Sequence, residues 1–261
     1  MARGVSTVLD VAICLLLIGV AVGTLAAAVP DDDWRSTVDG DPAAASVGTV
    51  TATVPVAGDH EAHGTLAQHL ARASILSATL DGERLLESSY PGATRRAVER
   101  RTADRVRVTA RWRPYPDAPL AGGLVVGPRP PSTADVAATR LTVDSGMAVP
   151  EDVDSNESLA RAVAEAYVDR LFPLERTRVR LLDRRTAPKT ADRYRSIAET
   201  LGVDVAEPLA DALPRQANER LAGELGDRLT AGAETAPDGT GSVPEGRATG
   251  RVEIVVRRWE P

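Results

Sequence analysis

Residues 11–29 read VAICLLLIGVAVGTLAAAV, nineteen residues without a charged side chain. An α-helix rises about 1.5 Å per residue, so roughly 20 apolar residues cross the hydrocarbon core of a bilayer. Arg3 precedes the stretch, and an acidic triplet at residues 31–33 follows it. Because basic residues favour the cytoplasmic side, we expect a cytoplasmic N-terminus and an extracytoplasmic remainder. The sequence therefore predicts a single-pass protein of the cell membrane, with the lipid bilayer as its first partner.

Three interpretations of this segment stay open. The helix could be a plain signal anchor. It could be a secretory signal peptide that is cut after Ala28, so that Val29 becomes the new N-terminus. The third interpretation starts from residues 3–9, RGVSTVL, which stand directly before the apolar helix.

The run RGVSTVL resembles the class III signal of archaeal type IV pilin-like proteins. In that family a peptidase cuts before the apolar stretch, and the helix stays on the mature protein. Carried over, the cut follows Gly4 and leaves Val5 as the N-terminus; the haloarchaeal version has Pro at the place of Thr7 and Gly at that of Asp10. The resemblance, together with an arginine-rich, acidic composition, implies an uncharacterised haloarchaeal membrane-anchored protein. Its expected partners are pilin-like subunits or secretion machinery of the type IV pilus or type II kind.

Three residues are candidates for packing between such helices. Asp10 lies at the helix start, where the backbone dipole favours an acid. It is either a hydrated residue at the membrane edge or, as the resemblance implies, a partner for a neighbouring subunit's N-terminal amine. Gly19 and Gly23 form a G-x-x-x-G pattern, which permits two membrane helices to approach closely.

The rest of the chain predicts a mixed α+β extracytoplasmic domain. Residues 30–47 have the composition of a linker, and residues 48–261 form the domain, in one or two subdomains with a boundary near residue 150. Alternating apolar residues predict strands, and apolar residues at helical spacing predict helices. The expected strands cover 49–56, 105–113, 141–143, 177–182 and 251–259. The expected helices cover 64–80, 155–171, 190–201 and 209–230, while residues 114–134 are expected to be mostly loop.

Composition excludes several classes of protein. The formal net charge is −6 and there is no basic tail, which argues against nucleic-acid binding. The single cysteine, Cys14, excludes a disulfide framework and every cysteine-rich zinc module. Four arginines share one side of the strand at 105–113 with Thr109, and this side is either a solvated sheet face or an anion-binding stripe. These arginines are Arg105, Arg107, Arg111 and Arg113.

The histidines provide the one candidate metal cluster, with His60, Glu61, His63 and His69 close in sequence. The order H-E-A-H-G is not the H-E-x-x-H zinc motif, because the second histidine comes one residue too early. We therefore expect His60 and His63 in a surface loop before a helix. No nucleophile elbow and no glycine-rich phosphate loop occurs either, so we assign no catalytic, cofactor-binding or metal-binding residue.

Asn156 begins the sequon Asn-Glu-Ser, a candidate glycosylation site that an extracytoplasmic domain would make usable. Its place at a predicted helix start should keep the side chain exposed. We expect a non-enzymatic cell-surface protein, a pilin-like component or accessory of a pilus or secretion-like assembly. The alternative is a stand-alone, membrane-anchored binding module with an unidentified ligand. An anchored hydrolase using the histidines is the third possibility.

Overall fold

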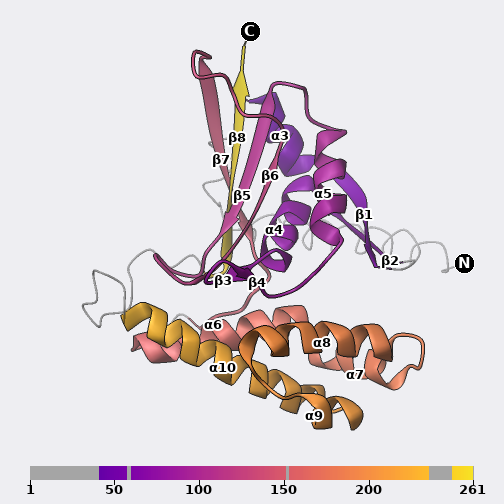
Figure 1. Cartoon of the computed structure of the whole chain (residues 1–261). Coiled ribbons are helices and arrows are strands. Elements are labelled where there is room, and N and C mark those ends of the chain that lie inside the picture. Colours follow the sequence, from indigo (N-terminus) through magenta and orange to yellow (C-terminus); the bar gives the residue numbers. More distant parts are fainter. Residues whose placement is uncertain (1–40, 58–59, 151–152, 235–248, 261) are drawn as a thin grey trace, which may run out of the picture. The chain divides into compact units, whose positions relative to one another are not determined.

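The computed structural model describes residues 41–57, 60–150, 153–234 and 249–260 (Figure 1). Of these described residues, 47% are helical and 24% lie in strands, which confirms the mixed α+β class. The helices are α3 (Pro42–Thr49), α4 (Leu66–Leu76), α5 (Tyr90–Glu99), α6 (Asn156–Leu171), α7 (Leu174–Leu182), α8 (Ala187–Leu201), α9 (Ala206–Ala210) and α10 (Pro214–Glu234). The strands are β1 (Thr51–Ala57), β2 (His60–Thr65), β3 (Thr79–Leu80), β4 (Glu83–Arg84), β5 (Val106–Trp112), β6 (Leu120–Val126), β7 (Val136–Asp144) and β8 (Arg251–Trp259).

Six strands form one antiparallel sheet in the order β4-β3-β6-β5-β8-β7, and β1 and β2 form a separate hairpin. The C-terminal strand β8 lies between β5 and β7. Residues on both sides of the possible boundary near residue 150 therefore build the same sheet.

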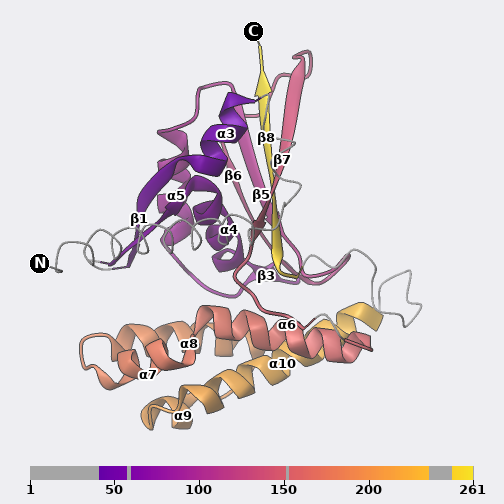
Figure 2. The ribbon, with the colours of Figure 1, turned by 180° about the vertical axis from the view of Figure 1, so that it is seen from behind.

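Strand β5 confirms the expected alternation. Val106, Val108, Ala110 and Trp112 are buried on one face. Helices α3, α4 and α5 lie over that face, as the two opposite views show (Figures 1 and 2). The other face of the central strands carries no helix from the described part of the chain.

The expected helix at 64–80 is present but shorter, because its C-terminal residues join the sheet as β3. Thr65 and Gln68 form a capping box at the start of α4: each side chain accepts a hydrogen bond from the other residue's backbone N–H. This satisfies two of the donors that a helix start leaves free.

The prediction of mostly loop over 114–134 was wrong for residues 120–126, which form β6. The glycines that suggested a loop have a packing role instead. A Cβ on Gly122 would lie 2.0 Å from the carbonyl oxygen of Ser74, so only glycine lets α4 pack this closely on the sheet.

Two further expectations were wrong. Residues 177–182 belong to helix α7 and not to a strand, because Arg and Leu have good helix propensity and Pro173 provides a start. Residues 42–47, expected as linker, lie in α3. Asp41 caps this helix by accepting a hydrogen bond from Ala43 N at 2.8 Å, and Pro42 occupies the first turn, where proline is favoured.

Helices α6 to α10 form a layer at one end of the sheet (Figures 1 and 2). The helix α6 ends before Pro173, as predicted, and of the two cap candidates in the sequence, Asp154 and Ser155, it is Ser155 that caps it. The expected helix at 209–230 is wrong at its start, because α9 ends at Ala210 and Pro214 begins a new helix, α10. The hydroxyl of Tyr115 donates to the carbonyl of Leu229 at 3.1 Å and connects the end of the sheet to α10.

No helix among the described residues is both long and apolar enough to cross a bilayer. The expected membrane helix at residues 11–29 lies outside the described ranges.

Candidate functional site

The candidate residues of the N-terminal segment all lie outside the described part of the chain. They are the processing residues Gly4 and Val5 and the packing residues Asp10, Gly19 and Gly23.

Asn156 is the first residue of α6, and its sequon is part of the helix start. Ser158 Oγ accepts a hydrogen bond from Ser155 N at 3.1 Å, and Ser155 Oγ accepts one from Ser158 N at the same distance. Asn156 is half-buried, and its Oδ1 has no hydrogen-bond partner in the described structure. This differs from the expected exposed side chain. The folded sequon is a capping motif.

The three histidines do not come together. His60 and His63 lie on strand β2 and not in a loop, while His69 lies inside α4. His63 Nδ1 is 2.8 Å from Thr53 Oγ1 on β1. No group of three possible metal-ligating side chains occurs within the described ranges.

His69 is buried, with 2% of its surface exposed. Its Nε2 lies 2.9 Å from the carbonyl oxygen of Ala52, and its Nδ1 lies 2.6 Å from the hydroxyl of Tyr90. A carbonyl only accepts, so Nε2 carries the proton and Nδ1 accepts from Tyr90. Burial lowers the pKa of His69 below 6.5, which keeps the ring neutral. The ring thus joins β1, α4 and α5.

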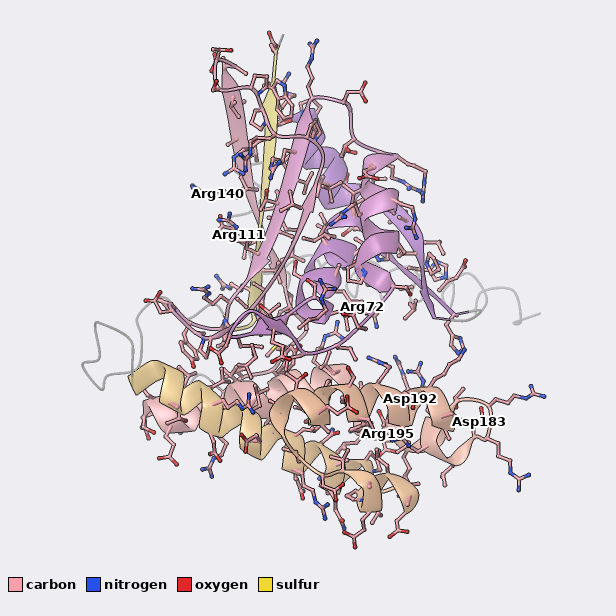
Figure 3. All side chains as sticks on the ribbon, in the orientation of Figure 1. Arg72, Arg111, Arg140, Asp183, Asp192 and Arg195 are labelled. Atoms are coloured by element: carbon pink, nitrogen blue, oxygen red, sulfur yellow. The ribbon has the colours of Figure 1, made fainter. Side chains whose placement is uncertain are left out.

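The uncovered side of the sheet forms a first candidate surface, called here the open sheet face. It is a shallow hollow of about 1040 Å³ over β5, β6, β7 and β8. Cross-strand pairing places Arg111 beside Glu253, and Val255 beside Arg140. Arg111 and Arg140 extend from this side of the sheet, away from the covering helices (Figure 3).

The open sheet face is basic with a small apolar centre. Arg140 Nε lies 3.4 Å from Glu253 Oε1. No ion pair occurs within the described ranges for the other arginines of this face, Arg107, Arg111, Arg251 and Arg257. Thr109 and Val255 are 5% and 8% exposed between these long side chains. Such a face suits contact with an acidic surface.

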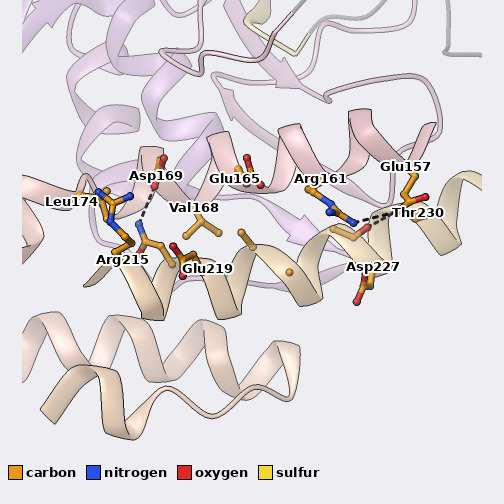
Figure 4. A pocket seen from close by; sticks show the side chains of 14 residues that line it. Glu157, Arg161, Glu165, Val168, Asp169, Leu174, Arg215, Glu219, Asp227 and Thr230 are labelled. Carbon is orange, nitrogen blue, oxygen red and sulfur yellow. Dashed lines mark hydrogen bonds and ion pairs between the residues drawn. The ribbon is translucent and has the colours of Figure 1, made fainter. Parts of the chain in front are cut away.

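A second cavity, of about 600 Å³, lies between α6 and α10 and is called here the helix groove (Figure 4). Buried Val168, Ala222 and Gly226 form its base. Five carboxylates and two guanidinium groups surround them. The charged residues are Glu157, Glu165, Asp169, Glu219, Asp227, Arg161 and Arg215.

One end of the helix groove is held by the buried side chain of Asn218. Its Nδ2 donates to Asp169 Oδ1 and to the carbonyl of Phe172, each at 3.0 Å. Its Oδ1 accepts from the hydroxyl of Tyr194 at 2.6 Å. These bonds connect α6, α8 and α10 and keep the groove in shape.

Residues 9–259 of the chain match a family described as a family of unknown function, DUF7284. The chain belongs to this family. No curated protein and no solved structure matches it significantly.

In this DUF7284 protein, the third candidate surface consists of most of α7, the loop that follows it and the first part of α8. It is called here the basic hairpin (residues 175–195). Eight of its side chains are basic and three are acidic, a net charge of +5 in a chain of net charge −6. Its loop lies at the extremity of the helical layer in both views (Figures 1 and 2). We missed this feature in the sequence, although the local excess of arginine over acid was visible there.

Two arginines at the base of the helical layer are largely removed from solvent. Burial lowers the pKa of both Arg170 and Arg193, and nearby arginines, Arg72 among them, add to the effect. Arg193 lies over the ring of Phe172, with its Cζ 5.4 Å from the ring centroid. These charges extend the positive potential of the basic hairpin toward the sheet in this member of DUF7284.

Proposed function

We propose that the protein is a non-enzymatic, single-pass cell-surface protein, a pilin-like component or accessory of a type IV pilus or secretion-like assembly. Residues 11–29 anchor it in the cell membrane, with the N-terminus in the cytoplasm and the α+β domain outside. The anchor helix provides lateral packing, and the domain provides contacts at the surface.

The observation that carries this proposal is the order of segments at the N-terminus. The run RGVSTVL at residues 3–9 stands directly before nineteen uncharged residues, and a folded domain begins about a dozen residues later with the cap of α3. The family match begins at residue 9 and includes the apolar stretch. This supports a helix that belongs to the protein itself.

The short connection adds a geometric argument. Eleven residues, 30–40, separate the apolar stretch from Asp41. Fully extended, they span at most about 40 Å. Copies anchored in one membrane therefore hold their domains at similar heights, where the surfaces of neighbouring domains can meet.

The mature N-terminus tests the proposal. We expect mass spectrometry of the protein from native membranes to find Val5 as the first residue, and sheared filaments to contain the protein. Gly4→Leu should abolish the cut, since the resemblance requires a small residue there. Asp10→Ala should reduce assembly, while the matched variant Asp31→Ala should leave it unchanged. A start at Val29, or an uncut chain absent from filaments, would contradict the proposal.

A second candidate is a stand-alone binding module on the same anchor, and the open sheet face favours it. Arg107, Arg111 and Arg257 form a basic cluster without ion pairs in the described structure. If the protein stays uncut and membrane-bound, this face is the first place to seek a ligand. The variant Arg111→Glu should then reduce binding to an acidic ligand such as heparin.

A further inference from the structure

The basic hairpin exposes two large apolar side chains. Val179 and Leu182 on α7 are 68% and 66% exposed, the highest values for large hydrophobic residues in the described structure. They stand three residues apart and therefore lie on one side of the helix. An exposed apolar pair on a short helix at the extremity of a domain is typical of a contact surface.

Positive charge surrounds this pair. Arg176, Arg178, Arg184 and Arg185 are exposed, and no ion pair occurs for them within the described ranges. Two acidic residues of the hairpin, labelled in Figure 3, already have partners within it. Asp183 accepts a hydrogen bond from the hydroxyl of Thr186, and Asp192 forms an ion pair with Arg195. The arginines are therefore available to an acidic partner.

The helix groove has the complementary chemistry. Its base is apolar, and its exposed side chains carry five negative and two positive charges. Arg161 pairs with Glu157 at 3.2 Å, and Asp169 accepts from Asn218 (Figure 4). Glu165, Glu219 and Asp227 have no ion pair in the described structure. Gly223 adds open space, since a Cβ there would meet nothing within 4 Å.

We propose that the basic hairpin of one copy docks into the helix groove of a second copy, so that successive copies join head to tail. Val179 and Leu182 enter the groove, and the arginines beside them pair with its carboxylates. The two surfaces share no residue, so each copy can give one contact and receive another. Such a heterologous contact joins subunits into an open chain, unless the rotation between successive copies closes a ring.

The position of Asp41 in the fold indicates that the basic hairpin contacts a second copy and not the membrane. Asp41 contacts Thr139 and Arg258, at one end of the long strands. The helical layer contacts the other end, through Trp112 and Tyr115. The chain thus enters the domain at the end opposite to the basic hairpin. The inference deepens the proposed function, and it rests on that function for the placement of both copies in one membrane.

Directed cysteine cross-linking tests the contact in the full-length protein. In a Cys14→Ser background in native membranes, Leu182→Cys combined with Gly223→Cys should give, on oxidation, a ladder of dimers, trimers and longer products. Each single variant should stay monomeric. The matched pair Val125→Cys with Gly223→Cys, whose first residue lies exposed on the open sheet face, should give no ladder. A double variant that stops at the dimer, or stays monomeric, would overturn the head-to-tail contact.

Charge reversal provides a second test of the contact between hairpin and groove. Arg176→Glu with Arg178→Glu should reduce the ladder about tenfold, because like charges then face each other. Adding Glu165→Arg and Glu219→Arg should restore it. The matched reversal Arg95→Glu, at an exposed position on α5, should have no effect. Loss without restoration would overturn the pairing of hairpin and groove.

The results separate this inference from the proposed function. A mature start at Val5 without a ladder would overturn the contact and leave the pilin-like function. A ladder formed by an unprocessed chain that is absent from filaments would support the contact and contradict the function.

Discussion

The indole of Trp112 in β5 stacks on the ring of Tyr167 in α6, with centroids 5.8 Å apart and planes inclined by 10°. The indole Nε1 donates to the carbonyl of Thr249, and the hydroxyl of Tyr167 donates to that of Ile75 at 3.4 Å. One aromatic pair thus connects the sheet, α4 and the helical layer that carries both the helix groove and the basic hairpin.

Removing one ring should separate these layers. Tyr167→Ala should lower the free energy of unfolding of the full-length protein by about 3–5 kcal/mol, as for other large aromatic residues in cores. Tyr167→Phe keeps the stack and loses one hydrogen bond, so it should cost only about 1 kcal/mol. Denaturant unfolding measures both. Equal losses for the two variants would show that the ring contact contributes nothing.

Gly122 should tolerate no side chain. In Gly122→Ala the new Cβ would clash with the carbonyl oxygen of Ser74, so α4 must move away from β6. We expect a loss of stability of about 2–4 kcal/mol, within the range of overpacked and strained sites. Gly223→Ala is the matched control. Its Cβ meets nothing within 4 Å, and alanine favours a helix, so this variant should gain roughly 0.5–1 kcal/mol. Thermal or denaturant unfolding compares the two.

His69 should make stability depend on pH. Burial, with Arg72 and His63 adding repulsion, lowers its pKa in the folded protein below the unfolded value of about 6.5. Below pH 6.5 the unfolded chain therefore binds a proton that the folded chain does not. The free energy of unfolding should fall as the pH drops from about 7 to 5, by at most about 1.4 kcal/mol per pH unit from this group.

Variants isolate that contribution. His69→Gln should lower stability at pH 7.5 by about 1–3 kcal/mol, because it disturbs the bonds to Tyr90 and Ala52. It should also flatten the pH dependence between 7 and 5.5. His60→Gln, at an exposed position on β2, should leave the slope unchanged. Identical slopes for the wild type and His69→Gln would remove His69 as the titrating group.

Asn218 should be essential to the shape of the helix groove. Asn218→Asp keeps the size but replaces both donors with a carboxylate beside Asp169. We expect a loss of about 2–4 kcal/mol, from unsatisfied partners and like-charge repulsion. If the docking proposal holds, the cross-linked ladder should also weaken. Glu219→Gln, one residue away and exposed, is the control and should change stability by less than about 0.5 kcal/mol.

Much of the candidate site could not be predicted from sequence. The sequence indicated the arginine side of β5. It did not indicate the neighbouring residues from β7 and β8, because pairing between distant segments leaves no local pattern. The helix groove needs α6 and α10 side by side, although their first residues, Asn156 and Pro214, are 58 positions apart in the chain. No sequence pattern indicates the structural role of Asn218, since its three hydrogen-bond partners lie at least 24 residues away in the chain.

The elements that the sequence determined by itself are those with a complete local signal. Strand β5 alternates strictly, β8 alternates over residues 251–254, and α6 has a serine cap, an apolar face and a terminating proline. The tertiary structure alone decided that β8 lies between β5 and β7, that glycine-rich residues 120–126 form a strand under α4, and that His69 is buried away from His60 and His63. Periodicity, capping and propensity act within about a dozen residues of chain. Strand register, close approach of two backbones and burial of a side chain depend on which distant segment packs against the residue. That choice is made only when the core forms.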